Sequence, residues 1–130
     1  MKRSVFILIA ALIPVMFGSL MMFAPELMLY NTLTVEITTG LRAVTQWVGF
    51  GVFTLGIINF LARNDNGSAS LKAVIVGNIL FHGLGMCFDV YDYSIGIMRL
   101  TGLITGLIPH SVLALGFVYY LWKLPAERSN

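Results

Sequence analysis

The stretch NILFHGLGMCFDVYD, residues 78–92, is apolar enough to lie in a membrane, yet it carries Asn78, His82 and Asp89. These positions are four and then seven residues apart, so they share one face of a helix. Polar groups are costly in hydrocarbon and need partners, so this face is predicted to point into a protein interior. The stretch therefore predicts a membrane helix whose polar face is covered by other helices.

The composition places the whole chain in the membrane class. Of its 130 residues, 58% are hydrophobic and 11% charged, and the mean hydropathy is +0.86. Soluble domains carry about 25% charged residues, and a soluble protein this small could not hide so much apolar surface. A net charge of +2 without a basic run argues against a nucleic-acid partner. The single cysteine, Cys87, excludes an internal disulfide.

Four segments are predicted to cross the membrane, at residues 5–23, 41–62, 71–89 and 99–122. The first has 19 residues and would cover about 28 Å as a helix, close to the ~30 Å of a bilayer core. Two cations followed by an apolar run also resemble a secretory signal, but we interpret this segment as the first span. The prediction is an all-α integral membrane four-helix bundle, a single membrane domain over residues 1–130.

The connection at residues 24–40 is predicted to lie at the outer membrane interface. Pro25 can begin a short helix. Residues 32–38 alternate polar and apolar side chains, which fits either a strand-like lid or a helix. The run Arg63-Asn64-Asp65-Asn66-Gly67-Ser68 is predicted to be a turn at the opposite face of the membrane.

The distribution of basic residues predicts the orientation. With the N-terminus inside, the outer side holds only Arg42 and Arg99. The inner side then holds Lys2, Arg3, Arg63, Lys72, Lys123 and Arg128. This asymmetry predicts that both termini are cytoplasmic. The expected location is a bacterial inner membrane.

Polar side chains near the outer ends of the spans suggest a binding site. The candidate ligand-binding residues are Arg42, Gln46, Asn78, His82, Asp89, Asp92, Arg99 and His110. One interpretation is an outer polar mouth that binds an anionic or polar headgroup between two arginines. The other is a structural clamp that fixes the register of the helices, because ion pairs at helix ends are common.

His82 and His110 are predicted at similar depths, roughly 10–17 Å inside the outer ends of their spans. On antiparallel neighbours they could face each other, bind haem b axially, hold a metal, or pass a proton to a quinone. Alternatively they are separate core histidines, His82 bonded to Asn78 and His110 to the carbonyl freed near Thr105. We expect no metal and no cofactor, with haem b or quinone as the alternative.

Motifs for enzymatic chemistry are missing from the sequence, which has no serine nucleophile motif, no phosphate-binding glycine loop and no paired zinc-type ligands. Met86 and Cys87 offer soft sulfur ligands, but methionine also fills apolar cores, which is the favoured interpretation. Gly102 and Gly106 form a GxxxG pair, which indicates close helix packing.

The first half of the chain resembles the DoxX-like group of small four-span bacterial membrane proteins. The resemblance lies in Phe23-Ala24-Pro25, the span opening Leu41-Arg42, the glycines Gly49, Gly51 and Gly56, and the ending Leu61-Ala62-Arg63. Some members of that group resemble subunits of quinone-linked oxidoreductases. The resemblance implies an accessory or ligand-binding role, and no catalytic residue is carried over from it.

The resulting hypothesis is a non-enzymatic membrane protein, either an accessory subunit or a lipid- or quinone-binding module. Its partners would be membrane lipid and either another membrane protein or further copies of itself. A haem- or quinone-linked redox protein that uses His82 and His110 is the first alternative. A small oligomeric transporter is the second, although no inverted repeat relates the two halves.

Overall fold

The computed structural model describes residues 1–124, which form five helices. Their bounds are α1 Arg3–Phe23, α2 Pro25–Thr32, α3 Thr39–Ala62, α4 Ala69–Ser94 and α5 Leu100–Trp122. α1, α3, α4 and α5 are each long and apolar enough to cross a membrane. The predicted all-α class is confirmed. α4 continues past the predicted end at residue 89, so Asp92 also lies on the helix.

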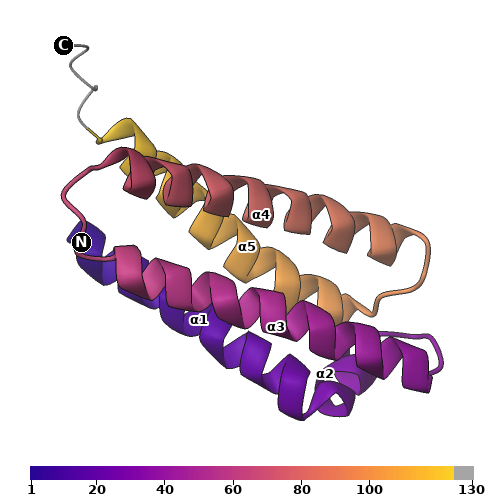
Figure 1. Cartoon of the computed structure of the whole chain (residues 1–130). Helices are drawn as coiled ribbons and strands as arrows, with labels where there is room; N and C mark the ends of the chain where they lie inside the picture. Colours follow the sequence, from indigo (N-terminus) through magenta and orange to yellow (C-terminus); the bar gives the residue numbers. More distant parts are fainter. Residues whose placement is uncertain (125–130) are drawn as a thin grey trace.

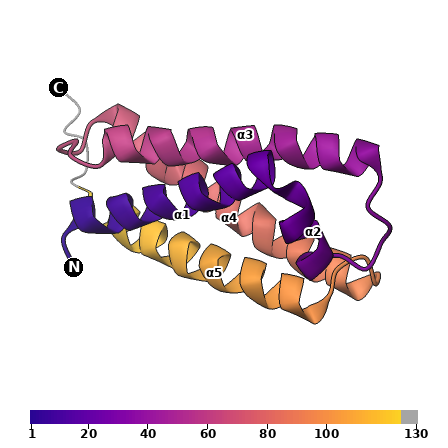
Figure 2. The ribbon, with the colours of Figure 1, turned by 90° about the horizontal axis from the view of Figure 1, so that it is seen from below.

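The four long helices form two packed pairs. α1 runs along α3, and α4 runs along α5, whereas contacts between the pairs are sparse (Figures 1 and 2). The first residues and the end of α5 lie at the same end of the bundle, as do Arg63 and Lys72. We call this the inner end, following the charge-based prediction. Arg128 lies outside the described residues.

Large apolar side chains cover the outside of the bundle. Leu12, Phe50, Phe88 and Trp122 are among many that are more than half exposed. Soluble proteins rarely expose continuous apolar surface on this scale, because its contact with water is unfavourable. This surface is suited to contact with lipid chains, so the protein is a multi-pass membrane protein.

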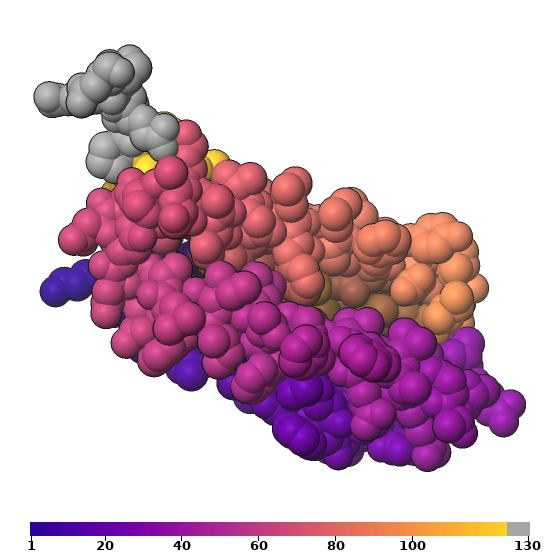
Figure 3. All heavy atoms as spheres, viewed as in Figure 1, coloured from indigo at the N-terminus to yellow at the C-terminus, as the bar shows by residue number. Residues whose placement is uncertain are grey.

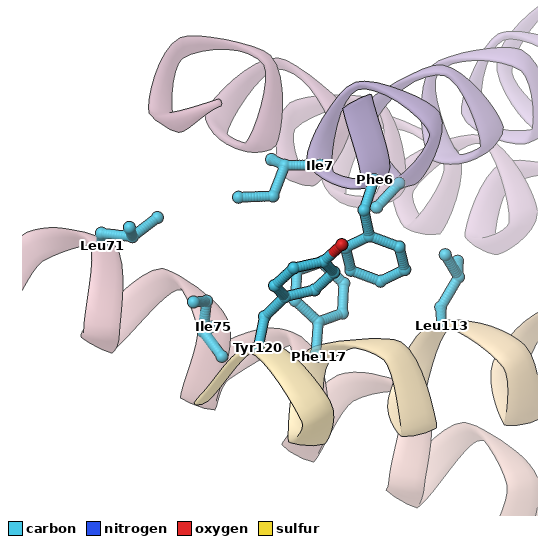
Figure 4. Packing of buried hydrophobic residues seen from close by; sticks show 8 residues of the cluster. Phe6, Ile7, Leu71, Ile75, Leu113, Phe117 and Tyr120 are labelled. Atoms are coloured by element: carbon cyan, nitrogen blue, oxygen red, sulfur yellow. The ribbon is translucent and has the colours of Figure 1, made fainter. Parts of the chain in front are cut away.

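The hydrophobic core lies near the inner end, where both pairs meet (Figure 4). The Phe6 ring of α1 packs edge-on against Phe117 of α5, with the ring centres 4.9 Å apart. Leu71 and Ile75 of α4 are fully buried beside them. The Tyr120 hydroxyl donates a hydrogen bond to the carbonyl of Met1 over 2.8 Å, which gives a partner to the polar tip of a buried ring.

Glycines let α1 and α3 approach each other closely. A Cβ placed on Gly18 would lie 2.5 Å from the backbone nitrogen of Phe53. One placed on Gly49 would lie 2.6 Å from the Met21 Cβ, and one on Gly56 would lie 2.7 Å from the Ala11 carbonyl oxygen. The backbones can therefore make van der Waals contact, which is a main source of helix association in lipid.

The connection between α1 and α3 is fastened to the loop between α4 and α5. The Thr34 amide donates to the carbonyl of Ile97 over 2.9 Å, and Leu33 forms an isolated antiparallel bridge with Met98. The Arg99 amide donates to the Thr32 carbonyl over 2.8 Å. Thr32 thus ends α2, residues 33–38 are not helical, and α2 is held across the outer end of the bundle.

The turn between α3 and α4 is organised by Asp65. Its carboxylate accepts hydrogen bonds from the amides of Gly67 and Ser68 and from the Ser68 hydroxyl. The hydrogen bond from the Ser68 hydroxyl, and to a smaller extent the one from the Ser68 backbone amide, lower the pKa of Asp65 below its usual value. Ser68 in turn caps α4 by accepting from the Leu71 amide. The predicted turn is confirmed, and it begins the helix that carries His82.

Replacing Gly49 by alanine should destabilise the bundle, whereas replacing Gly51 should not. Both positions lie in α3, but a Cβ at Gly51 would meet nothing within 4 Å. Gly49→Ala forces two helices apart and should cost about 1–3 kcal/mol relative to Gly51→Ala. The free energy of unfolding in detergent micelles measures both. Equal stability of the two variants would contradict the close packing of α1 against α3.

Candidate functional site

A row of polar side chains lies where α4 faces α5, with His82 buried and Asp89 and His110 half-buried. Gly85 is required beside His110, because a Cβ on it would lie 2.8 Å from the His110 ring. Gly106 has the same relation to Asp89, whose carboxylate oxygen would be 2.6 Å from an added Cβ. Each glycine thus makes room for a polar side chain of the opposite helix. This row of polar residues is the candidate site.

The two histidines contact each other at the centre of this row. Their Nδ1 atoms are 2.8 Å apart, which is a hydrogen-bond distance. His82 is 3% exposed and its ring lies parallel to that of Phe117, at 6.2 Å between centres. His110 is half-buried. Of the two arrangements considered from the sequence, the structure has the histidines facing each other on antiparallel helices, and His82 does not bond to Asn78.

Two polar atoms of α4 are buried without a hydrogen-bond partner, His82 Nε2 and Asp89 Oδ2. The only other such side-chain atom in residues 1–124 is Nε of Arg3, at the inner end. A buried polar atom without a partner costs about 1–3 kcal/mol. Asp89 lies one helical turn beyond Gly85, beside which the His110 ring packs. These two atoms are therefore places where a bound molecule or water would find a strong interaction.

Asn78 lies one helical turn inward from His82 and joins the two helix pairs. Its amide nitrogen donates to Oδ1 of Asn59 over 2.7 Å, and the Asn59 nitrogen donates back to Asn78 over 2.9 Å. Both side chains are fully buried. Their remaining amide hydrogens go to the carbonyls of Ala10 and Val74. Asn78 is therefore fully bonded, and its place in the structure is a clamp between α3 and α4.

The outer arginines are bound elsewhere. Arg42 forms an exposed ion pair with Glu26 at 3.2 Å, and Arg99 donates from Nε to the carbonyl of Leu33. Gln46 donates to the Met22 carbonyl and lines an open groove of about 360 Å³ with Met22, Trp47 and Phe50. Within residues 1–124, no hydrogen bond or ion pair connects either arginine to Asp89 or to the histidines.

The predicted outer residues therefore serve different parts of the fold. Arg42 joins α3 to α2, and Arg99 joins the start of α5 to the connection after α2. The carbonyl of Asp92 accepts from the amides of Ile97 and Met98 and so closes the α4–α5 loop. An exposed ion pair such as Arg42–Glu26 contributes about 0–1 kcal/mol, which suits the clamp interpretation for the arginines.

Some residues of the interior could not be picked out from the sequence. For Asn59 the sequence offers one signal, a polar amide inside an otherwise apolar span, which indicates a buried partner but does not identify it. Ser111 donates to the sulfur of Met86 over 3.1 Å across the α4–α5 interface. Serine is common in membrane helices, so its partner had to come from the structure.

The histidine pair does not fit the axial haem b alternative or a bridging metal. Each nitrogen lies about 2.0–2.1 Å from a bound zinc ion, so two nitrogens on one tetrahedral zinc lie roughly 3.3 Å apart, and two on opposite sides of a metal lie roughly 4 Å apart. The observed separation is 2.8 Å. Within residues 1–124, no three or more His, Cys, Asp or Glu side chains are grouped as a metal site would require. The pair would have to open before it could bind an ion of this size.

The Asn59–Asn78 clamp predicts coupled stability effects. Asn59→Leu or Asn78→Leu leaves a buried amide without a partner and should cost about 1–3 kcal/mol of unfolding free energy. The double replacement should cost less than the sum of the two. Denaturant titration in micelles measures this, with Asn66→Leu in the exposed turn as the control. Additive effects would argue against direct pairing.

A comparison of the chain with family models, curated proteins and solved structures gave no match.

Proposed function

We propose that this protein is a non-enzymatic membrane module that binds a membrane-soluble molecule with a polar head, a quinone or a lipid. The site is the α4–α5 polar row, with His82, His110 and Asp89 as its polar contacts. The observation that carries the proposal is the pair of buried atoms without partners, His82 Nε2 and Asp89 Oδ2. A ligand that supplies those hydrogen bonds would gain the free energy that the empty site lacks.

The surroundings of the row suit such a ligand. Apolar side chains of α4 and α5 are exposed on both sides, for example Phe81, Phe88 and Ile108. Figure 3 shows a furrow between the atoms of α3 and α4, with atoms of α5 at its base. A hydrocarbon tail can lie against such surfaces while the head reaches the polar row. The half-buried Asp89 and His110 give access from outside the protein.

The proposal narrows the site expected from the sequence. Arg42, Gln46 and Arg99 already have partners at the outer end, so they stabilise the fold around the site rather than hold the head of the ligand. The resemblance of the first half to DoxX-like proteins supports a binding role without catalysis. A bacterial inner membrane remains the proposed location.

A redox role is the second candidate, favoured by the direct contact of His82 with His110. Two imidazoles in hydrogen-bond contact could exchange a proton with a quinone as it is reduced or oxidised. A water-soluble electron donor added to vesicles should then reduce the quinone in the membrane faster when the protein is present. A water-soluble electron acceptor should likewise oxidise the reduced quinone faster. Equal rates with and without protein would remove this candidate.

The binding proposal predicts a ligand that purifies with the protein. Mass spectrometry of protein extracted in mild detergent should find quinone or lipid at about one molecule per chain. His82→Phe and Asp89→Leu should each reduce its amount at least about fivefold, since either change removes a polar contact worth about 1 kcal/mol or more. The matched control is Glu36→Leu, which alters an exposed acid in the outer connection.

The identity of the molecule separates quinone from lipid. Equal amounts in the wild-type protein and both site variants would overturn the proposal, because binding would then not depend on the polar row. A stoichiometric polypeptide without a small molecule would also overturn it and indicate an accessory subunit.

A further inference from the structure

We infer that His82 and His110 form one proton-binding unit, which takes up a single extra proton and can carry it from His110 Nε2 to His82 Nε2. The inference goes beyond ligand binding. The two histidines can share a proton whether or not a ligand is bound. The proposed function matters only for the identity of the group that would accept a proton from His82 Nε2.

The short contact fixes how many protons lie between the rings. At 2.8 Å the two Nδ1 atoms can share one proton, with one nitrogen as donor and the other as acceptor. Two protons would place one hydrogen against the other, and no proton would place two lone pairs together. A proton fits this gap, whereas a zinc ion shared by the two Nδ1 atoms would need a wider one, as the metal–nitrogen distances above show.

Two neutral arrangements follow from this sharing. When His110 donates, its Nε2 carries no proton and His82 carries a proton on Nε2. When His82 donates, His82 Nε2 is bare and His110 carries the Nε2 proton. The pair therefore always has one bare nitrogen, at one of its two ends, and that nitrogen is where one extra proton can bind.

The two ends differ in their surroundings. His110 is half-buried, and Asp89 of the facing helix is itself half-buried near the outer end of α4. His82 Nε2 is fully buried and has no partner. His110 is therefore the more accessible of the two histidines, so the extra proton enters at His110, while His82 Nε2 is shielded from solvent.

Only protons move during the transfer. A proton binds the bare His110 Nε2, and the pair becomes a cation. The shared proton then moves from His110 Nδ1 to His82 Nδ1. Loss of the proton on His82 Nε2 to a hydrogen-bond-accepting oxygen restores a neutral pair in its second arrangement. One proton has entered and one has left, with no change in oxidation state.

The histidine pair returns from its second neutral arrangement to its first most simply by the same proton transfers in reverse order. A ring flip of His82 is opposed by the parallel Phe117 ring and by Phe81, which lies edge-on at 5.3 Å. The unit therefore stores or delivers one proton at a time, and it is not a continuous channel. Below it the Asn59–Asn78 amides are mutually bonded and carry no titratable proton.

Few other ionisable groups belong to the surrounding helices. They are Arg3 of α1, Glu26 and Tyr30 of α2, Arg42 of α3, Lys72, Cys87, Asp89, Tyr91, Asp92 and Tyr93 of α4, and Tyr119 and Tyr120 of α5. Asp89 lies one helical turn beyond Gly85, beside which the His110 ring packs, so it is the acid of α4 closest to His110 along the helix. As an anion it stabilises the cationic state of the pair, so it is a positioning residue for the proton.

Nuclear magnetic resonance of the full chain in lipid vesicles tests the unit directly. The chain has only two histidines, so nitrogen-15 labelling of histidine gives four ring signals. We expect a nitrogen–nitrogen coupling across the shared hydrogen bond between the Nδ1 atoms. Acid titration across the histidine range should add one proton per chain, not two.

Three variants extend the test. His110→Gln should abolish the coupling, and Ser111→Ala, a control on the same interface, should keep it. Asp89→Asn should keep the coupling but lower the imidazolium fraction at a given acidic pH. Should His110→Gln fail to fold, the wild-type spectrum still decides. Absence of the coupling, or two protons taken up independently, would overturn the inference whether or not a ligand purifies with the protein.

Discussion

The constraint on which the structure depends is that hydrocarbon supplies no hydrogen bonds. Every polar group inside a span must therefore find its partner within the protein. The hydroxyls of Ser19, Thr45, Thr54 and Thr105 all donate to the carbonyl four residues earlier in their own helix. They are satisfied locally and place no demand on neighbouring helices. The amides and imidazoles cannot do this alone, so they determine which helices must meet.

This constraint separates the two helix pairs by chemistry. α1 and α3 meet through glycines and backbone contact at Gly18 and Gly49, and Gln46 and Asn59 of α3 donate hydrogen bonds to carbonyls of α1. α4 and α5 meet through His82, His110, Ser111 and Asp89, and their glycines serve to admit polar side chains. The first pair is closely packed. The second pair holds two of the three buried side-chain atoms without partners in residues 1–124, and binding and proton exchange are proposed there.

The sequence was sufficient for the spans and for the inward polar face of α4. Length and hydrophobicity place four helices, and the spacing of Asn78 and His82 places both side chains in the interior. Antiparallel packing at similar depth was enough to suggest that His82 and His110 face each other. These features depend on periodicity and length, which a single sequence contains.

The partners of the polar residues were beyond the reach of the sequence. Charge alone grouped Arg42 with Arg99, but each meets a residue of the connection between α1 and α3 instead. Asn78 meets Asn59 rather than His82, because α3 crosses α4 at that depth. Such pairings depend on helix rotation and crossing, and one residue of rotation changes the partner.

The division into two pairs has a consequence for how the chain assembles. α4 and α5 are consecutive, and α1 and α3 are separated only by the short α2, so each half can complete its own packing soon after it is inserted. The amides of Asn59 and Asn78 then fix the relative depth of the two halves, because both hydrogen bonds between them can form at only one depth. Two helix pairs that have already packed would then be aligned in depth by these amides, which gives one defined bundle even though the apolar surfaces alone would allow several.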